Sequence, residues 1–296
     1  MPDRLVPATL ARRDDGILVS PEYGELPRDA SRARAHANRM LAGTGLPARW
    51  QGLRTFTIVE TGFGTGSRFL ATWAAWRDDP ARCERLHFVA IEPHPFTRED
   101  LRRAVSHLVA DTTISENADA LIDAWPMHVP GLHRLEFDAG RVVLTLAFGD
   151  AHDMLQRLVA RADAFYLGNV VSAAHGDLLS ADVIRALARI AADGATYATH
   201  SHDDTVKHAL EQTGFTSRDV DDCAGEPALR VGEYAPRWRM RRHEPPRALP
   251  VAAREAIVIG AGLAGCAVVE RLAARGWNIT LIERHERIAS EASGNP

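Results

Sequence analysis

The chain has 296 residues, more than one ordinary domain, so two compact units are expected. Hydrophobic residues make up 46% and charged residues 25%, which is typical of a globular protein and too apolar for a disordered one. No apolar run reaches the roughly 18 residues of a membrane span. The first residues do not show a signal-peptide pattern, so a cytoplasmic protein is expected. The formal net charge of −4 does not indicate a nucleic-acid binder.

The cysteines and the basic residues add little to this. Cys83, Cys223 and Cys266 lie far apart without CxxC spacing, which excludes a disulfide framework and a cysteine zinc site. Lys207 is the only lysine, and five arginines fall between residues 237 and 247. Guanidinium groups suit phosphate, so this cluster weakly indicates a polyanionic partner. Genomic base composition explains the overall arginine bias equally well.

Strands and helices alternate along most of the chain. A helix is predicted over residues 30–41, and another contains Phe69, Leu70, Trp73 and Trp76. Strands are then expected at 55–60, 86–92, 141–148, 164–167 and 195–199, and further helices at 97–109, 151–158 and 181–192. This alternation favours an α/β fold with a parallel, doubly wound sheet.

A proline- and arginine-rich stretch interrupts the pattern, which then restarts. The sequence predicts one domain over 1–235, a linker over 236–252 and a second unit over 253–296. In the second unit a strand at 255–259, a helix to about residue 275 and a strand at 278–283 form one βαβ unit. One such unit buries too little surface for a complete cofactor site, so a truncated domain is expected.

The first glycine loop is the sequence ETGFGTG at residues 60–66. Gly62, Gly64 and Gly66 follow a strand and open a helix, where the backbone turns sharply and can approach a ligand. Glu92 ends the next strand, where a carboxylate can accept the hydroxyls of a ribose. Together they predict a cofactor site, with a ligand-free tight turn as the alternative.

Asp150 ends a later strand in the sequence FGD. Its carboxylate is placed to reach the adenine edge of the same cofactor. An exposed aspartate that caps the following helix is an equally good interpretation.

The second glycine loop carries a complete dinucleotide fingerprint. Gly260, Gly262 and Gly265 follow a strand and lead into a helix, and Glu283 ends the next strand. A glutamate at that position favours a ribose with free hydroxyls, hence FAD or NAD rather than NADP. The segment ASGN at 292–295 resembles the segment beside the FAD phosphates of amine-oxidase-like flavoproteins.

Several motifs, in order along the chain, resemble the MnmC family of tRNA-modifying enzymes. These are the two glycine loops with Glu60, Glu92 and the sequences HPFT at 94–97, GLHRL at 131–135 and FGD at 148–150. The resemblance implies a class-I methyltransferase domain, followed by the first βαβ unit of an FAD-binding oxidoreductase domain. It also implies S-adenosylmethionine and FAD as cofactors and tRNA as partner. The implied reaction methylates the aminomethyl nitrogen of 5-aminomethyl-2-thiouridine at the wobble position, after an FAD-dependent step.

Three departures from the family pattern bear on activity. Gly168 stands where the family has an aspartate, so methyl transfer is expected to be very weak or absent. His175 and Asp177 are the weak candidates for a relocated base. The sequence DDCAGEP at 221–227 is acidic where RNA phosphate favours cations. The first glycine loop continues as Ser67-Arg68, and Pro93 follows Glu92.

Other interpretations stay open. One is a degenerate paralogue that keeps the fold, and perhaps cofactor binding, without methyl transfer. Another is a protein-interaction module that uses the cleft as an interface. His200 and His202 lie two residues apart, and on a strand they would face the same way beside Asp203. Solvated side chains are a better interpretation of that pair than a zinc site, so no metal is expected.

Overall fold

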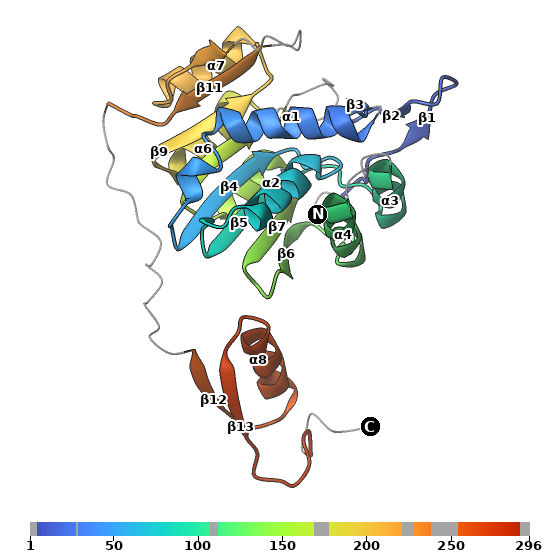
Figure 1. Cartoon of the computed structure of the whole chain (residues 1–296), viewed down its shortest axis with the longest axis vertical. Helices are drawn as coiled ribbons and strands as arrows, with labels where there is room; N and C mark the ends of the chain where they lie inside the picture. Colours follow the sequence, from blue (N-terminus) through green and yellow to red (C-terminus); the bar gives the residue numbers. More distant parts are fainter. Residues whose placement is uncertain are drawn as a thin grey trace. The chain divides into compact units, whose positions relative to one another are not determined.

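The computed structural model describes residues 5–27, 29–106, 112–168, 178–220, 228–237 and 254–290. The chain divides into two compact units (Figure 1). One contains residues 1–135 and 143–245, and the other contains residues 136–142 and 246–296. The loop candidates His175 and Asp177, the acidic segment 221–227, the segment 292–295 and all but the first two residues of the predicted linker lie outside the described residues.

An eight-stranded sheet with the order β10-β11-β9-β8-β4-β5-β7-β6 forms the centre of the first unit. The pairs β4–β5, β4–β8 and β8–β9 are parallel, whereas β11 runs antiparallel to both β9 and β10. The strands are β4 (Thr55–Thr61), β5 (Arg85–Glu92), β6 (Gly131–Phe137), β7 (Val142–Phe148), β8 (Ala162–Leu167), β9 (Ala191–Thr199), β10 (Arg218–Val220) and β11 (Leu229–Glu233).

Helices cover both faces of this sheet, as the predicted doubly wound fold requires. In Figure 1, α1 and α2 lie across the face nearer the viewer. The helices are α1 (Ala30–Gly43), α2 (Ser67–Asp78), α3 (Arg98–Ser106), α4 (Thr112–Asp123), α5 (Ala151–Arg157), α6 (Ala181–Ile190) and α7 (Asp204–Gln212), with a 3-10 turn η1 at Ala48–Trp50.

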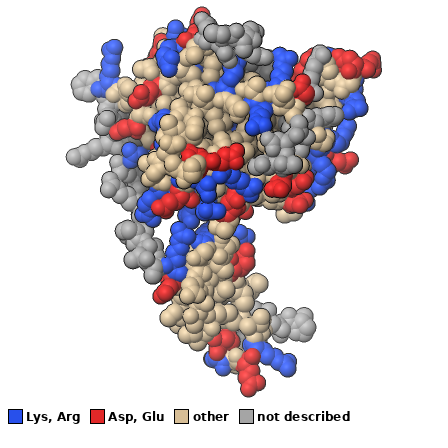
Figure 2. Space-filling view, in the orientation of Figure 1, with Lys and Arg blue, Asp and Glu red and all other residues tan. Residues whose placement is uncertain are grey.

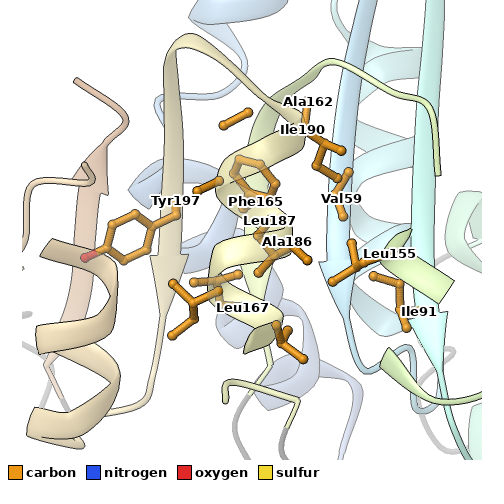
Figure 3. Packing of buried hydrophobic residues seen from close by; sticks show 14 of the residues in the cluster. Val59, Ile91, Leu155, Ala162, Phe165, Leu167, Ala186, Leu187, Ile190 and Tyr197 are labelled. Carbon is orange, nitrogen blue, oxygen red and sulfur yellow. The ribbon is translucent and has the colours of Figure 1, made fainter. Parts of the chain in front are cut away.

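One apolar cluster joins α5 and α6 to the sheet. Val183, Ile184 and Leu187 follow helical spacing along one face of α6 and are buried. Figure 3 shows Leu187 near Phe165 of β8, and Leu155 of α5 near Ile91 of β5. Ser180 caps α6, because its side chain accepts a hydrogen bond from the Val183 amide. This packing fixes the strand ends that carry the site.

The N-terminal segment forms a small antiparallel sheet of its own. Its strands are β1 (Ala11–Arg12), β2 (Leu18–Ser20) and β3 (Gly24–Glu25). The hydroxyl of Tyr23 donates to the carbonyl of His94 at 2.7 Å, and Ala8 forms a β-bridge with Phe96. These contacts hold the segment against the residues that follow β5.

The second unit contains the predicted βαβ arrangement. Strands β12 (Glu255–Ile259) and β13 (Asn278–Ile282) pair in parallel, and α8 (Leu263–Ala273) connects them. Apolar side chains on these elements stay exposed, with 83% exposure at Ile259 and 77% at Leu263. The described part of this unit therefore buries little apolar surface of its own.

The structure corrects several predictions. The sheet is mixed rather than parallel, because the unpredicted strands β10 and β11 return as an antiparallel pair at one edge. The β1–β3 sheet, α4, β6 and α7 were not predicted either. Strand β9 begins at Ala191, directly after α6, rather than at residue 195. Of the helix expected over 97–109, the structure describes Arg98–Ser106.

Candidate functional site

A cavity of about 410 Å³ opens at the carboxyl ends of β4, β5 and β8. Ligands of doubly wound sheets bind at this edge. The wall formed by the first glycine loop and the strand ends contains Thr61, Gly62, Phe63, Gly64, Thr65, Ser67, Arg68, Glu92, Pro93, His94, Gly168 and Leu178. The N-terminal segment and α1 contribute Glu22, Tyr23, Glu25, Leu26, Pro27, Arg32 and His36. The sequence interpretation missed this second group, since nothing local in it marks a ligand wall.

The first glycine loop has the conformation that its glycines predict. Gly62, Gly64 and Gly66 have φ angles of 81°, 56° and 73°, which side-chain-bearing residues rarely adopt. Gly66 is the N-terminal cap of α2 and has no side chain to satisfy the free amides of the first turn. A carboxylate or phosphate is favoured near such a helix end.

Glu92 is buried and already anchors the loop. Its Oε2 accepts hydrogen bonds from the amides of Phe63 at 2.8 Å and Gly64 at 2.9 Å. Its Oε1 accepts one from the amide of His94 at 2.8 Å. Burial and the neighbouring Glu92 carboxylate raise the pKa of Tyr23 well above its usual range. Glu92 therefore holds three backbone amides of the cavity wall in place, independently of any contact with a ligand.

Glu60 has a different role from the other predicted cofactor residues. It is fully buried in β4 and forms an ion pair with Arg68 of α2, which also donates to the Gly62 carbonyl at 2.7 Å. Burial raises the pKa of Glu60 to about 7, against the lowering effect of Arg68. Arg68 lines the cavity, whereas Glu60 does not. The departure Ser67-Arg68 therefore places a guanidinium beside the glycine loop.

Asp150 caps α5, as the alternative interpretation allowed. Its Oδ1 accepts from the amide of Asp153 at 3.0 Å, and the side chain does not line the cavity among the described residues. The Gly149 amide donates to the Glu92 carbonyl at 3.1 Å, so the ends of β5 and β7 are adjacent. Asp150 therefore lies at the same edge of the sheet as the cavity. Its contact with an adenine remains a prediction.

Gly168 has a packing role that the sequence does not reveal. A Cβ added there would lie 2.1 Å from the carbonyl oxygen of Thr61, and the Gly168 amide donates to the Thr61 hydroxyl at 2.9 Å. The ends of β4 and β8 approach too closely for any side chain at this position. The carboxylate of the family pattern has no room here with this backbone.

Two histidines meet at the same edge of the sheet. His36 of α1 stacks on His200 with ring centroids 3.9 Å apart. Strand β9 ends at Thr199, as predicted, so His200 and His202 lie beyond it and do not share a strand face. A ring nitrogen of His202 instead lies 2.7 Å from the Ala228 carbonyl. Within the described ranges no group of three acidic, histidine or cysteine residues could hold a metal ion.

The second glycine loop combines glycines and a strand-end acid in the same way as the first. Gly260 has φ 96°, and a Cβ on Gly265 would lie 1.8 Å from the Gly260 carbonyl. Gly262 caps α8. Glu283 Oε2 accepts from the amide of Ala261 at 2.7 Å, and backbone hydrogen bonds lower the pKa of Glu283. In each of these loops at least one backbone amide therefore donates to the acid at the end of the next strand.

Comparisons with known proteins match a part of each unit. Residues 112–226 match the S-adenosyl-L-methionine-dependent methyltransferase family, and residues 255–296 match the FAD dependent oxidoreductase family. Over 83% of this chain the fold resembles the crystal structure of MNMC2 from Aquifex aeolicus, with a TM-score of 0.57, 16% identity and 75% of that chain covered. The protein is a methyltransferase-fold chain that continues into the start of an FAD-type domain.

The sequence comparison is more specific. All 296 residues align, at 97% identity, with the tRNA 5-methylaminomethyl-2-thiouridine biosynthesis bifunctional protein MnmC of Burkholderia ambifaria, and at 71% over 297 aligned positions with that of Burkholderia vietnamiensis. The chain spans 45% and 46% of these two relatives. This similarity confirms the resemblance to MnmC proteins, and the two family matches confirm the expected S-adenosylmethionine-dependent and FAD-dependent folds. No helix in the described part of the chain is long and apolar enough to cross a membrane.

Proposed function

We propose that the first unit binds S-adenosylmethionine in the cavity at the first glycine loop. The observation that supports this best is the position of Glu92, whose carboxylate joins the glycine loop to the end of β5 at the cavity wall. The glycine loop and the start of α2 suit the methionine moiety, because free helix amides favour its carboxylate. Glu92 would hold the ribose and Asp150 the adenine edge.

The residues present fit this cofactor. A carboxylate has about four lone-pair sites, and Glu92 uses three of them on backbone amides. One site remains for a ribose hydroxyl. Asp150 is exposed and uses one oxygen to cap α5, so its other oxygen can accept a bond from the adenine amino group.

The reaction that we propose is methylation of the aminomethyl nitrogen of a wobble 5-aminomethyl-2-thiouridine in tRNA. It rests on the family and on the printed names of the relatives, which describe biosynthesis of 5-methylaminomethyl-2-thiouridine. A tRNA substrate agrees with a cytoplasmic location. Acidic and basic side chains are interspersed on the face shown in Figure 2, so phosphate contacts would be local. The fingerprint Gly260, Gly262, Gly265 and Glu283 would belong to the FAD site of the whole protein.

A calorimetric titration with two ligands tests the ribose assignment. We expect S-adenosylhomocysteine to bind the wild-type chain more tightly than an analogue that lacks both ribose hydroxyls. If Glu92 contacts the ribose, Glu92→Gln should reduce this preference. If Glu92 only anchors the loop, the variant should weaken both ligands equally, and the ribose assignment would be wrong.

A methyl-transfer assay on tRNA bearing 5-aminomethyl-2-thiouridine tests the reaction. Cofactor binding without transfer would favour the degenerate paralogue. Absence of both would favour an interaction module.

A further inference from the structure

The His36–His200 stack lies beside Gly168 at the end of the sheet. Parallel pairing of Leu167 with Thr199 makes Gly168 and His200 the next residues after two neighbouring strands. His36 reaches this point from α1, stacks on His200 and lines the cavity together with Gly168. An imidazole therefore faces the cavity near the position where the family pattern has a carboxylate.

The carboxylates of the cavity wall are engaged elsewhere. Glu22 accepts from the Ser20 hydroxyl at 2.7 Å, and Glu25 pairs with Arg13 at 2.6 Å. Glu92 is held by three backbone amides. None of these contacts directs a carboxylate toward Gly168. Among the described residues of the cavity wall, His36 and His94 carry ring nitrogens that can accept a hydrogen bond. His94 lies beside Glu92, so His36 is the acceptor on the side of Gly168.

The surroundings keep both imidazoles neutral. Burial lowers the pKa of His36 to about 4, and the nearby Arg68, Arg39 and Arg32 lower it further. Burial likewise lowers the pKa of His200 to about 3, helped by His36, Arg39, Arg68 and His202. A neutral imidazole has one acceptor nitrogen at neutral pH. The same positive surroundings disfavour a protonated amine, so a bound amine would keep its nucleophilic lone pair.

We infer that His36 accepts a hydrogen bond from the amine that is methylated, and that His200 holds the His36 ring in place by stacking. This inference rests on the proposed function. The amine nitrogen forms a bond to the methyl carbon while the carbon–sulfur bond breaks and sulfur keeps its electron pair. The nitrogen becomes a methylated ammonium and then releases a proton to solvent. His36 orients the lone pair by holding an N–H, and His200 is a positioning residue.

Steady-state methyl transfer to tRNA carrying 5-aminomethyl-2-thiouridine tests these roles. His36→Ala should lower kcat by roughly 10²-fold, the lower end of what a positioned proton acceptor contributes. His36→Gln keeps an acceptor oxygen and should recover part of the loss. His200→Phe keeps an aromatic ring that can stack on His36 and should lose less activity than His200→Ala, which should behave like a weaker His36→Ala. Affinity for S-adenosylhomocysteine should change less than kcat in all four, because the inference gives both histidines a role toward the amine and none toward the methyl donor.

A binding experiment without the methyl donor separates this inference from the proposed function. Adding 5-aminomethyluridine to ¹⁵N-labelled chain should shift the His36 ring-nitrogen resonances, assigned with His36→Ala, and 5-methyluridine should not. A shift without methyl transfer would support the contact while the proposed reaction fails. Wild-type transfer with an equally fast His36→Ala would overturn the inference and leave the proposed function standing. Identical shifts with both nucleosides, or no shift with either, would also overturn it.

Discussion

Replacing Gly168 by alanine is the sharpest test of the close approach between β4 and β8. The new Cβ would start 2.1 Å from the Thr61 carbonyl oxygen and would need 3.0 Å, so the two backbones must separate by 0.9 Å. That movement also stretches the hydrogen bond from the Gly168 amide to the Thr61 hydroxyl, 2.9 Å long. Overpacking costs about 1–3 kcal/mol, and the weakened bond adds about 1 kcal/mol. We expect Gly168→Ala to lower the free energy of unfolding by about 2–4 kcal/mol.

Gly43→Ala is the matched control. Its Cβ would meet side chains instead of a backbone carbonyl. These are the flexible end of Leu229 at 2.6 Å, the Ala198 Cβ at 3.0 Å and the Val231 Cγ1 at 3.1 Å. Gly43 is also the last residue of α1, where alanine gains up to about 1 kcal/mol of helix propensity. We expect a change in stability of less than about 1 kcal/mol, because these two effects oppose one another.

Urea unfolding followed by tryptophan fluorescence measures both variants. Trp50, Trp73, Trp76 and Trp125 are buried in the first unit, so the signal reports mainly on that unit. A Gly168→Ala protein as stable as Gly43→Ala would refute the close approach. The same geometry predicts that Gly168→Asp lowers stability without restoring a catalytic carboxylate. Faster methyl transfer by Gly168→Asp than by wild type would favour the interpretation drawn from the sequence alone.

Three further predictions follow from buried charges and from the second unit. Arg49 donates to the carbonyls of Asp163 and Gly194 and to the Thr196 hydroxyl. Arg49→Met should therefore lower the free energy of unfolding in urea by about 2–4 kcal/mol. The control Arg54→Ala, at an exposed arginine, should lower it by less than about 0.5 kcal/mol. The folded pKa of Glu60, about 7, exceeds its ordinary value of 4.5, so its contribution to stability is present below pH 4.5 and is lost as the pH rises to 7. Glu60→Gln should therefore gain stability relative to wild type between about pH 5 and about pH 8, and parallel pH profiles would contradict this. The purified chain should show no flavin absorption spectrum, because α8 buries none of its residues, and a yellow preparation would disprove it.

Local chemistry explains which parts of the site were predictable from the sequence. The glycine loops and the acids Glu92 and Glu283 lie within one strand–loop–helix–strand segment each, so their spacing alone indicates their arrangement. The βαβ unit and most helices were predicted for the same reason. The antiparallel return of β11 was not, because its pairing with β9 depends on contacts between segments distant in the chain.

The other wall of the cavity depends on such distant contacts. Tyr23 is held near the glycine loop by its hydrogen bond to the His94 carbonyl and by its ring contact with Phe96. His36 and His200 come together only because α1 packs across β9. The sequence interpretation treated Gly168 as a lost acid, since a sequence does not show that the Thr61 carbonyl occupies the space of a side chain. The match to the methyltransferase family covers residues 112–226. It therefore does not include α1 or the segment before it, which form this wall.

Glu92 shows why an acid at a strand end does not by itself establish a ribose contact. Two of its three backbone hydrogen bonds hold the first glycine loop, and the third holds the His94 amide after β5, before any ligand arrives. Two ribose hydroxyls need two acceptor sites, whereas a carboxylate with about four has only one left. Full ribose recognition would therefore release one of the three backbone amides, from the loop or from His94, and that amide would then need a new acceptor on the cofactor or in water. Because loop conformation and ribose contact share one carboxylate, cofactor binding and loop order should be energetically coupled at this residue.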